Sequence, residues 1–123
     1  MSHLMPDDRT AIEEYVATIR ERFPSRILDV ILFGSKARGD AGTESDIDLV
    51  VVVDAENIED MEFPEVRSAL WRIASQVSLQ YDVVLSCRVF DRGRWARAKR
   101  MRLPLYRAVV SDGISLFPEA LAM

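Results

Sequence analysis

The sequence predicts a mixed α and β domain with a small sheet, on three observations. Two long stretches repeat apolar residues at helical spacing, and three short apolar runs have the length of strands. The predicted order is helix, strand, strand, helix, strand, helix, strand. The chain has 123 residues, of which 49% are hydrophobic and 29% charged, a balance typical of a globular protein. We therefore expect one domain over residues 1–123, with 1–6 a flexible or added segment.

The first predicted element is a helix over residues 6–23 (PDDRTAIEEYVATIRERF). Its apolar side chains recur three or four positions apart, so they share one helical face. They are Ile12, Val16, Ile19 and Phe23. Asp7 or Asp8 could cap the start of this helix, and Pro24 ends it.

Two strands and a loop follow this helix. Residues 26–33 (RILDVILF) predict the first strand. Residues 34–45 (GSKARGDAGTES) are typical of a loop, with room for one helical turn through Lys36 to Arg38. Residues 46–54 (DIDLVVVVD) predict the second strand, whose unbroken run from Leu49 to Val53 indicates burial on both faces.

The second half predicts a helix, a strand and a helical end. After an acidic linker at 54–65, helical spacing returns in Val66, Leu70, Ile73 and Val77, widened by Trp71 and Ala74. Residues 81–90 (YDVVLSCRVF) predict the third strand, with Asp82 at its start. One or two short helices divided at Pro104 follow, then a helix stop at Gly113 and a brief last strand. We expect one face of the sheet to be covered by Trp95, Leu105, Tyr106, Val109 and Val110.

Charge is unevenly distributed along the chain, although the net charge is only −4. Residues 88–102 hold seven basic residues and one acid. Such a stretch could contact a nucleic acid, the phosphates of a nucleotide or an acidic partner, or it could be an ordinary solvated helix face. The overall acidity argues against direct binding of nucleic acid.

Two further features of the sequence concern its expected cellular location and its cysteine chemistry. Nothing resembles a signal peptide, and no apolar run approaches the roughly 20 residues that cross a bilayer, so we expect a cytoplasmic protein without a membrane partner. Cys87 is the only cysteine, which excludes an internal disulfide and a Cys-based zinc site. We expect Cys87 to be buried in its strand.

Three aspartates stand where a loop meets an apolar strand: Asp46, Asp48 and Asp82. Asp46 and Asp48 share one strand face, because successive side chains alternate. If the strands that carry all three are neighbours running the same way, the three carboxylates converge. Carboxylates suit Mg²⁺, and two such ions about 4 Å apart can stabilise both oxygens of an in-line phosphoryl displacement. The alternative for any one of them is a loop residue that hydrogen-bonds to backbone N–H groups.

The Gly34-Ser35 turn has features that a phosphate site needs. Glycine lets backbone N–H groups approach closely, Ser35 can donate a hydrogen bond, and Lys36 and Arg38 carry charge suited to a triphosphate. The turn matches neither G-x-x-x-x-G-K-[ST] nor G-x-G-x-x-G.

Gly34-Ser35, ten further residues and then Asp46-Ile47-Asp48 resemble the G-S-x10-D-x-D signature of the DNA polymerase beta-like nucleotidyltransferases. The GSKARGDA segment, the later Asp82 and the closing LPLYRAVVSDGISLF are similar to the minimal nucleotidyltransferase branch of that superfamily. The resemblance covers nearly the whole chain, and it implies the fold of that superfamily and the transfer of AMP from ATP to a hydroxyl acceptor.

The resemblance also implies a role for each matching residue. Asp46 and Asp48 would ligate two Mg²⁺ ions, and Asp82 would ligate the ion that activates the acceptor hydroxyl and could act as its base. The residues implied for the β- and γ-phosphates are Gly34 and Ser35, with Arg38 or Lys36 nearby.

The expected acceptor follows from a missing feature. Larger superfamily members append an acceptor-binding domain that this sequence lacks, so the acceptor would be small or presented by another protein. The branch is similar to antitoxins of HEPN-type RNase toxins, some of which adenylylate a toxin tyrosine, and the Arg-x4-His-x-Tyr toxin motif is absent here. The alternatives are a binding module that neutralises its partner by contact, through residues 88–102 or an apolar helix face, and a nucleotidyltransferase acting on a small molecule such as an aminoglycoside.

Overall fold

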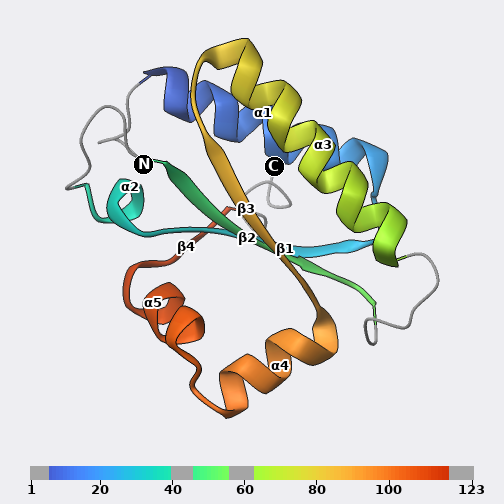
Figure 1. Ribbon diagram of the computed structural model, residues 1–123, viewed down its shortest axis with the longest axis vertical. Helices are drawn as coiled ribbons and strands as arrows, with labels where there is room; N and C mark the ends of the chain where they lie inside the picture. The colour runs from blue at the N-terminus through green and yellow to red at the C-terminus, as the bar shows by residue number, and fades with distance from the viewer. Residues whose placement is uncertain (1–5, 40–45, 56–62, 117–123) are drawn as a thin grey trace.

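The computed structural model describes residues 6–39, 46–55 and 63–116, which form a four-stranded sheet with helices on both faces (Figure 1). The helices are α1 (Pro6–Arg22), α2 (Ser35–Arg38), α3 (Phe63–Tyr81), α4 (Arg92–Arg100) and α5 (Pro104–Asp112). The strands are β1 (Ile27–Phe33), β2 (Ile47–Val53), β3 (Leu85–Asp91) and β4 (Ile114–Ser115). The predicted mixed α and β class is confirmed, and the elements follow one another in the predicted order.

The sheet is mixed, with the strand order β3-β2-β1-β4. β2 runs parallel to β3 and antiparallel to β1, and β4 pairs antiparallel with β1. β2 is therefore an inner strand with helices over both of its faces. This position explains why Leu49–Val53 is buried without a break, as the sequence predicted.

α1 and α3 cover one face of the sheet, drawn above it in Figure 1. The predicted stripe of α1 is buried at Ile12, Val16 and Ile19, with Phe23 partly buried just beyond the helix. Tyr15 is fully buried among them, and its hydroxyl donates to the Leu70 carbonyl of α3 at 3.2 Å. This bond satisfies a polar group within the core and joins the two helices.

The predicted stripe of α3 is also buried, except at Trp71. That side chain is 46% exposed, and its indole N–H donates to the Cys87 carbonyl at 3.3 Å. Trp71 lies beside β3, an edge strand, so it covers the margin of the sheet rather than the centre of its face. Cys87 itself is half-buried and packs against the core.

α4 and α5 cover the opposite face, drawn below the sheet in Figure 1. Trp95 contacts Phe90 at a ring-centroid distance of 5.3 Å and Tyr106 at 5.7 Å. Leu105 and Val109 pack in the same layer, as predicted. The prediction for Val110 was wrong: this side chain is 62% exposed, because it follows Val109 around the helix and turns away from the sheet.

Some expectations lie outside the described residues, namely those for 1–5, for 40–45 of the loop and for 56–62 of the acidic linker. Within the part of the chain that the structure describes, no helix combines the length and the apolar character of a membrane span.

Candidate active site

Asp48 lies on the face of β2 that α4 and α5 cover, at the end where β2 begins. Ile47 and Leu49 pack into the core beneath α1 and α3, whereas Val50 belongs to the cluster beneath α5. Because side chains alternate along a strand, Asp48 shares the face of Val50, and Asp46 lies one step earlier at the entrance to the strand. Asp48 is half-buried and Asp46 is exposed, so the pair sits at the rim of the sheet.

Gly34 packs directly against the Asp48 carboxylate. β1 ends at Phe33, which pairs with Asp48 in the antiparallel register, so the chain that leaves β1 passes beside this side chain. Gly34 has a φ of +80°, and a Cβ added to it would lie 2.5 Å from Oδ2 of Asp48. Glycine meets both requirements, because it adopts positive φ readily and has no Cβ.

α2 begins immediately after Gly34 and contains the half-buried Ser35 as its first residue. The Gly34 carbonyl accepts from the N–H groups of Ala37 and Arg38. The first N–H groups of a helix find no acceptor within the helix itself, so the N–H of Ser35 points out of the start of α2. The predicted helical turn is confirmed, and it presents polar groups beside the aspartate pair.

The surroundings of Asp48 disfavour its charged form. Partial burial raises the pKa of this carboxyl, the adjacent Asp46 raises it further, and Arg88 and Arg38 oppose the rise. A cation between the two carboxylates would remove their repulsion. The pair fits Mg²⁺, which takes one or two protein carboxylates and completes its shell with water and substrate phosphates.

Asp82 does not join this pair. β2 and β3 are parallel neighbours, as convergence required, but the register places Ser86 opposite Asp48. β3 begins only at Leu85, and Asp82 lies in the turn after α3 with a φ of +54°. Among the described residues, no group of three or more Asp, Glu, His or Cys side chains could hold a metal ion. The predicted convergence is therefore limited to two of the three carboxylates.

Lys36 does not face the aspartate pair either. Its Nζ lies 2.6 Å from Oδ2 of Asp8 in α1, and both side chains are buried. An ammonium group in the interior requires a counter-charge, so this contact ties α2 to α1 instead of offering charge to a phosphate. It also corrects the expectation for Asp8, which pairs with Lys36 and is no helix cap. Sequence reasoning missed the pair because 28 residues separate its members.

Two arginines flank Asp48 from different sides of β2. Arg38, at the end of α2, forms a 2.9 Å ion pair with Asp112 of α5. Arg88 stands on β3 two residues after Ser86, so its side chain projects from the same face as Asp48. Sequence reasoning placed Arg88 only in the basic stretch, although strand alternation could have assigned it to this face.

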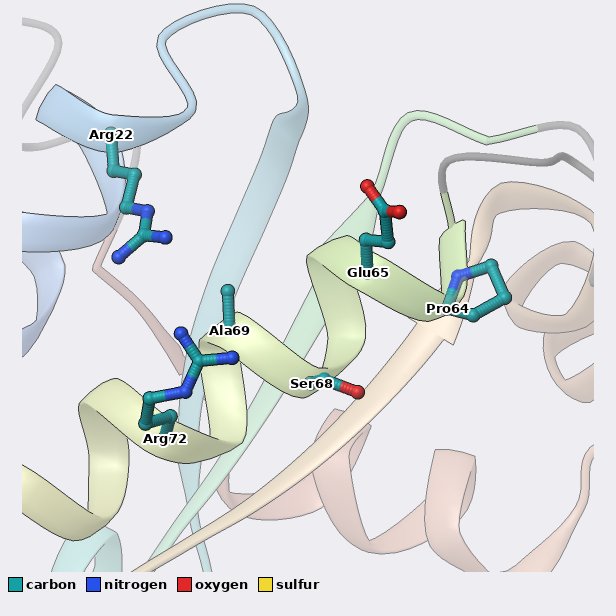
Figure 2. Close-up of a pocket in the computed structure, with 6 residues that line it drawn as sticks. All are labelled: Arg22, Pro64, Glu65, Ser68, Ala69 and Arg72. Atoms are coloured by element: carbon teal, nitrogen blue, oxygen red, sulfur yellow. The ribbon is translucent and has the colours of Figure 1, made fainter.

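A separate hollow of about 440 Å³ lies between the end of α1 and the start of α3 (Figure 2). It is lined by Arg22, Pro64, Glu65, Ser68, Ala69 and Arg72. None of the predicted site residues lines this hollow, and its two helices cover the face of the sheet that lies away from Asp48. The hollow is therefore not the candidate active site.

Comparisons with known proteins agree with this geometry. Residues 12–103 match the family described as nucleotidyltransferase domain. MJ0604 of Methanocaldococcus jannaschii, provisionally named a protein adenylyltransferase, is 31% identical over 111 residues, covering 90% of this chain and 99% of that protein. MJ0141 of the same organism, with the same provisional name, is 36% identical over 75 residues, covering 61% and 71%.

A solved structure shares the fold. The crystal structure of a toxin-antitoxin with AMP-PNP superimposes with a TM-score of 0.50 at 20% identity, covering 84% of this chain and 70% of that one. The family match spans most of the sequence, and MJ0604 is matched almost end to end. The chain thus belongs to the nucleotidyltransferase domain family, and the predicted enzyme class is confirmed.

Proposed function

We propose that the chain transfers AMP from ATP, with Mg²⁺, to a hydroxyl group of a partner protein in the cytoplasm. We further propose that this partner is a HEPN-type toxin and that the chain is its antitoxin. The observation that carries the reaction is the Asp48 carboxylate packed against Gly34, with the charge of Asp46 beside it. The provisional name of both curated relatives supports a protein acceptor, and the toxin-antitoxin structure with the same fold motivates the choice of partner.

The proposed roles follow from the positions of the side chains. Asp46 and Asp48 would hold the metal, which when bound neutralises charge on the triphosphate. Gly34 lets the backbone pass directly beside Asp48, and the N–H and hydroxyl of Ser35 at the start of α2 could donate to a phosphate bound there. Most of the catalysis would come from positioning and electrostatics, as phosphoryl transfer requires.

The transfer balances as a single displacement. The acceptor oxygen bonds to the α-phosphorus, the bond from that phosphorus to the bridging oxygen breaks, and pyrophosphate leaves with the electron pair. The hydroxyl proton passes to a carboxylate. Although Asp82 lies outside the aspartate pair in this structure, it is our candidate for that base and for a third ligand, because its turn precedes β3 at the same end of the sheet at which Asp46 precedes β2.

The direct test is adenylylation of a co-expressed HEPN-type partner. The purified pair is incubated with ATP and Mg²⁺, and intact-protein mass spectrometry measures AMP added to the partner. We expect one or more additions with the wild type and none with Asp46→Asn, Asp48→Asn. Asp7→Asn, an exposed aspartate of α1, serves as the matched control and should behave as the wild type. An unmodified partner with the wild-type chain would contradict the proposed reaction.

A second candidate function is neutralisation of the partner by contact alone. It is favoured by α4, whose exposed side chains include Arg94, Arg97 and Arg100, and by the exposed apolar Met101 and Leu103 that follow it. An Asp46→Ala, Asp48→Ala variant that still protects cells from the toxin would favour contact over catalysis. Loss of protection with an unchanged complex would favour catalysis.

A further inference from the structure

We infer that Arg88 binds a phosphate group of the nucleotide on the β3 side of Asp48. The inference rests on the proposed function, because it assigns one more residue to the same site. It places on β3 a positive charge of the kind that the sequence led us to expect from Lys36 and Arg38 of α2.

The register of the sheet carries the geometry. Ser86 pairs with Asp48 and Arg88 pairs with Val50, so Arg88 is the diagonal neighbour of Asp48 on the same face. The two side chains are close enough that the Arg88 charge lowers the pKa of the Asp48 carboxyl. Phe90, the next residue on this face of β3, packs in the layer of α4 and α5. Arg88 thus stands between that apolar layer and the carboxylates.

Arg88 differs from Lys36 and Arg38 in that no ion pair neutralises its side chain among the residues that the structure describes. The ammonium of Lys36 is neutralised by the buried Asp8, and the guanidinium of Arg38 is paired with Asp112. The side chain of Arg88 is exposed and forms no hydrogen bond or ion pair with any residue that the structure describes, and its charge lowers the pKa of the nearby Asp48 carboxyl. It is therefore a charged group beside the site whose guanidinium is bound by none of the side chains in residues 6–39, 46–55 and 63–116.

The chemistry of the guanidinium suits a phosphate. It stays protonated at any physiological pH, and its planar fork can donate two parallel hydrogen bonds to phosphate oxygens. Gly34 approaches Asp48 from the β1 side, whereas Arg88 lies on the β3 side. A triphosphate lying across the start of β2 would then have donors on both flanks. If Arg88 does not bind phosphate, it is an ordinary solvated residue of β3, and its substitution should leave the affinity for nucleotide unchanged.

The test is calorimetric titration of the whole chain with a non-hydrolysable ATP analogue and Mg²⁺. Arg88→Ala and Arg88→Gln should each weaken binding roughly tenfold or more, which is the effect of losing one hydrogen-bonded charge. Arg88→Lys should recover part of that loss. Arg100→Ala, which removes an exposed arginine of α4, should bind as the wild type. The melting temperatures of all four variants without ligand should match the wild type, because both arginines are exposed.

Each remaining outcome has a distinct meaning. If Arg88→Ala and Arg88→Gln bind the ATP analogue with wild-type affinity while Asp48→Ala does not bind it, the role of Arg88 is overturned. The proposed function then stays intact. Equal weakening by Arg100→Ala also overturns the role of Arg88, because the effect would then belong to overall charge. A wild-type chain that binds no analogue overturns the proposed nucleotide site and this inference together.

Discussion

Gly34 combines a backbone requirement and a packing requirement that other residue types do not meet. We expect Gly34→Ala to lower the free energy of unfolding by about 1–3 kcal/mol, because a non-glycine residue at positive φ is strained and its Cβ would displace the Asp48 carboxylate. Nucleotide binding should be lost as well. Chemical denaturation and calorimetric titration measure the two effects.

Gly93→Ala is the matched control, since Gly93 is exposed within α4 and lacks a positive φ. Alanine in a helix is favoured over glycine by about 0.5–1 kcal/mol, so this variant should be as stable as the wild type or more stable. If both glycine variants gained stability, the close approach between Gly34 and Asp48 would be wrong.

Asp48 makes the stability of the metal-free protein depend on pH. Its pKa in the folded state is raised by burial and by Asp46, so ionisation is harder in the folded than in the unfolded chain. The resulting loss of stability is absent below about pH 4, where both states are protonated, and develops as the pH rises through the folded-state pKa. Asp48→Asn should therefore melt above the wild type at pH 7 in EDTA, with the gain vanishing in acid. A lower melting point at pH 7 would contradict this electrostatic description, and Asp7→Asn should show no such trend.

Substitution of Asp82 should distinguish a structural role of this residue from a catalytic one. Asparagine tolerates the left-handed backbone at this turn, so Asp82→Asn should change the free energy of unfolding by no more than about 0.5 kcal/mol. As the proposed base and third ligand, it should nevertheless reduce AMP transfer by about 100-fold, the smaller end of the usual effect of a general base. The rate of AMP transfer is measured with radiolabelled ATP in reactions quenched at a series of times. Full activity in Asp82→Asn would leave this aspartate as a turn residue only.

At the scale of elements, the Lys36 and Asp8 pair fixes α2 against α1. Removing one member of a buried ion pair leaves an uncompensated charge and costs about 3–5 kcal/mol, which we expect for Lys36→Ala in denaturant unfolding. Lys36→Met with Asp8→Leu should cost far less, because neither charge remains. The exposed Arg9 and Glu13 pair of α1 is the control, and Arg9→Ala should cost less than about 1 kcal/mol. A small loss in Lys36→Ala would mean that the pair does not hold α2.

The elements themselves were largely predictable, because their signals are local. The α1 stripe repeats within one helix, and the run from Leu49 to Val53 reports burial on both faces without reference to any other segment. Asp46 and Asp48 were assigned to one face by the same local rule. Family resemblance added roles to these positions, but alternation alone placed the two carboxylates together.

The features that sequence reasoning missed depend on contacts between distant segments. Lys36 meets Asp8 only because α2 docks on α1, and Trp71 is exposed because β3 is an edge strand. Asp82 was expected at a strand start, but the register of β3 against β2 leaves it in the preceding turn. Such pairings are decided by tertiary packing, which single-residue propensities do not encode.

At the scale of the whole molecule, the main hydrophobic core and the candidate active site lie on opposite faces of the sheet. Its α1 and α3 face holds the larger apolar cluster, whereas Asp48 lies on the face of α4 and α5 where β2 begins. Arg88 lies on that same face in the middle of β3. The proposed site residues thus come from the turn after β1, from α2 and from the neighbouring strands β2 and β3. Changes at the rim can alter ligand binding while the core remains intact.

Ligand binding at this rim should therefore stabilise the entire fold. At a free ligand concentration of about 100 times the Kd, a single site adds about 2.7 kcal/mol to the free energy of unfolding. For a chain of this size, that corresponds to a rise in melting temperature of roughly 10 °C. We expect a non-hydrolysable ATP analogue to produce this rise with Mg²⁺ and to lose it in EDTA, measured by scanning calorimetry. Asp48→Ala should melt at one temperature in both conditions, because metal and nucleotide would then lack their shared anchor. An equal rise in EDTA would show that the nucleotide binds without the aspartate pair and its cation, and the proposed roles of Asp46 and Asp48 would have to be abandoned.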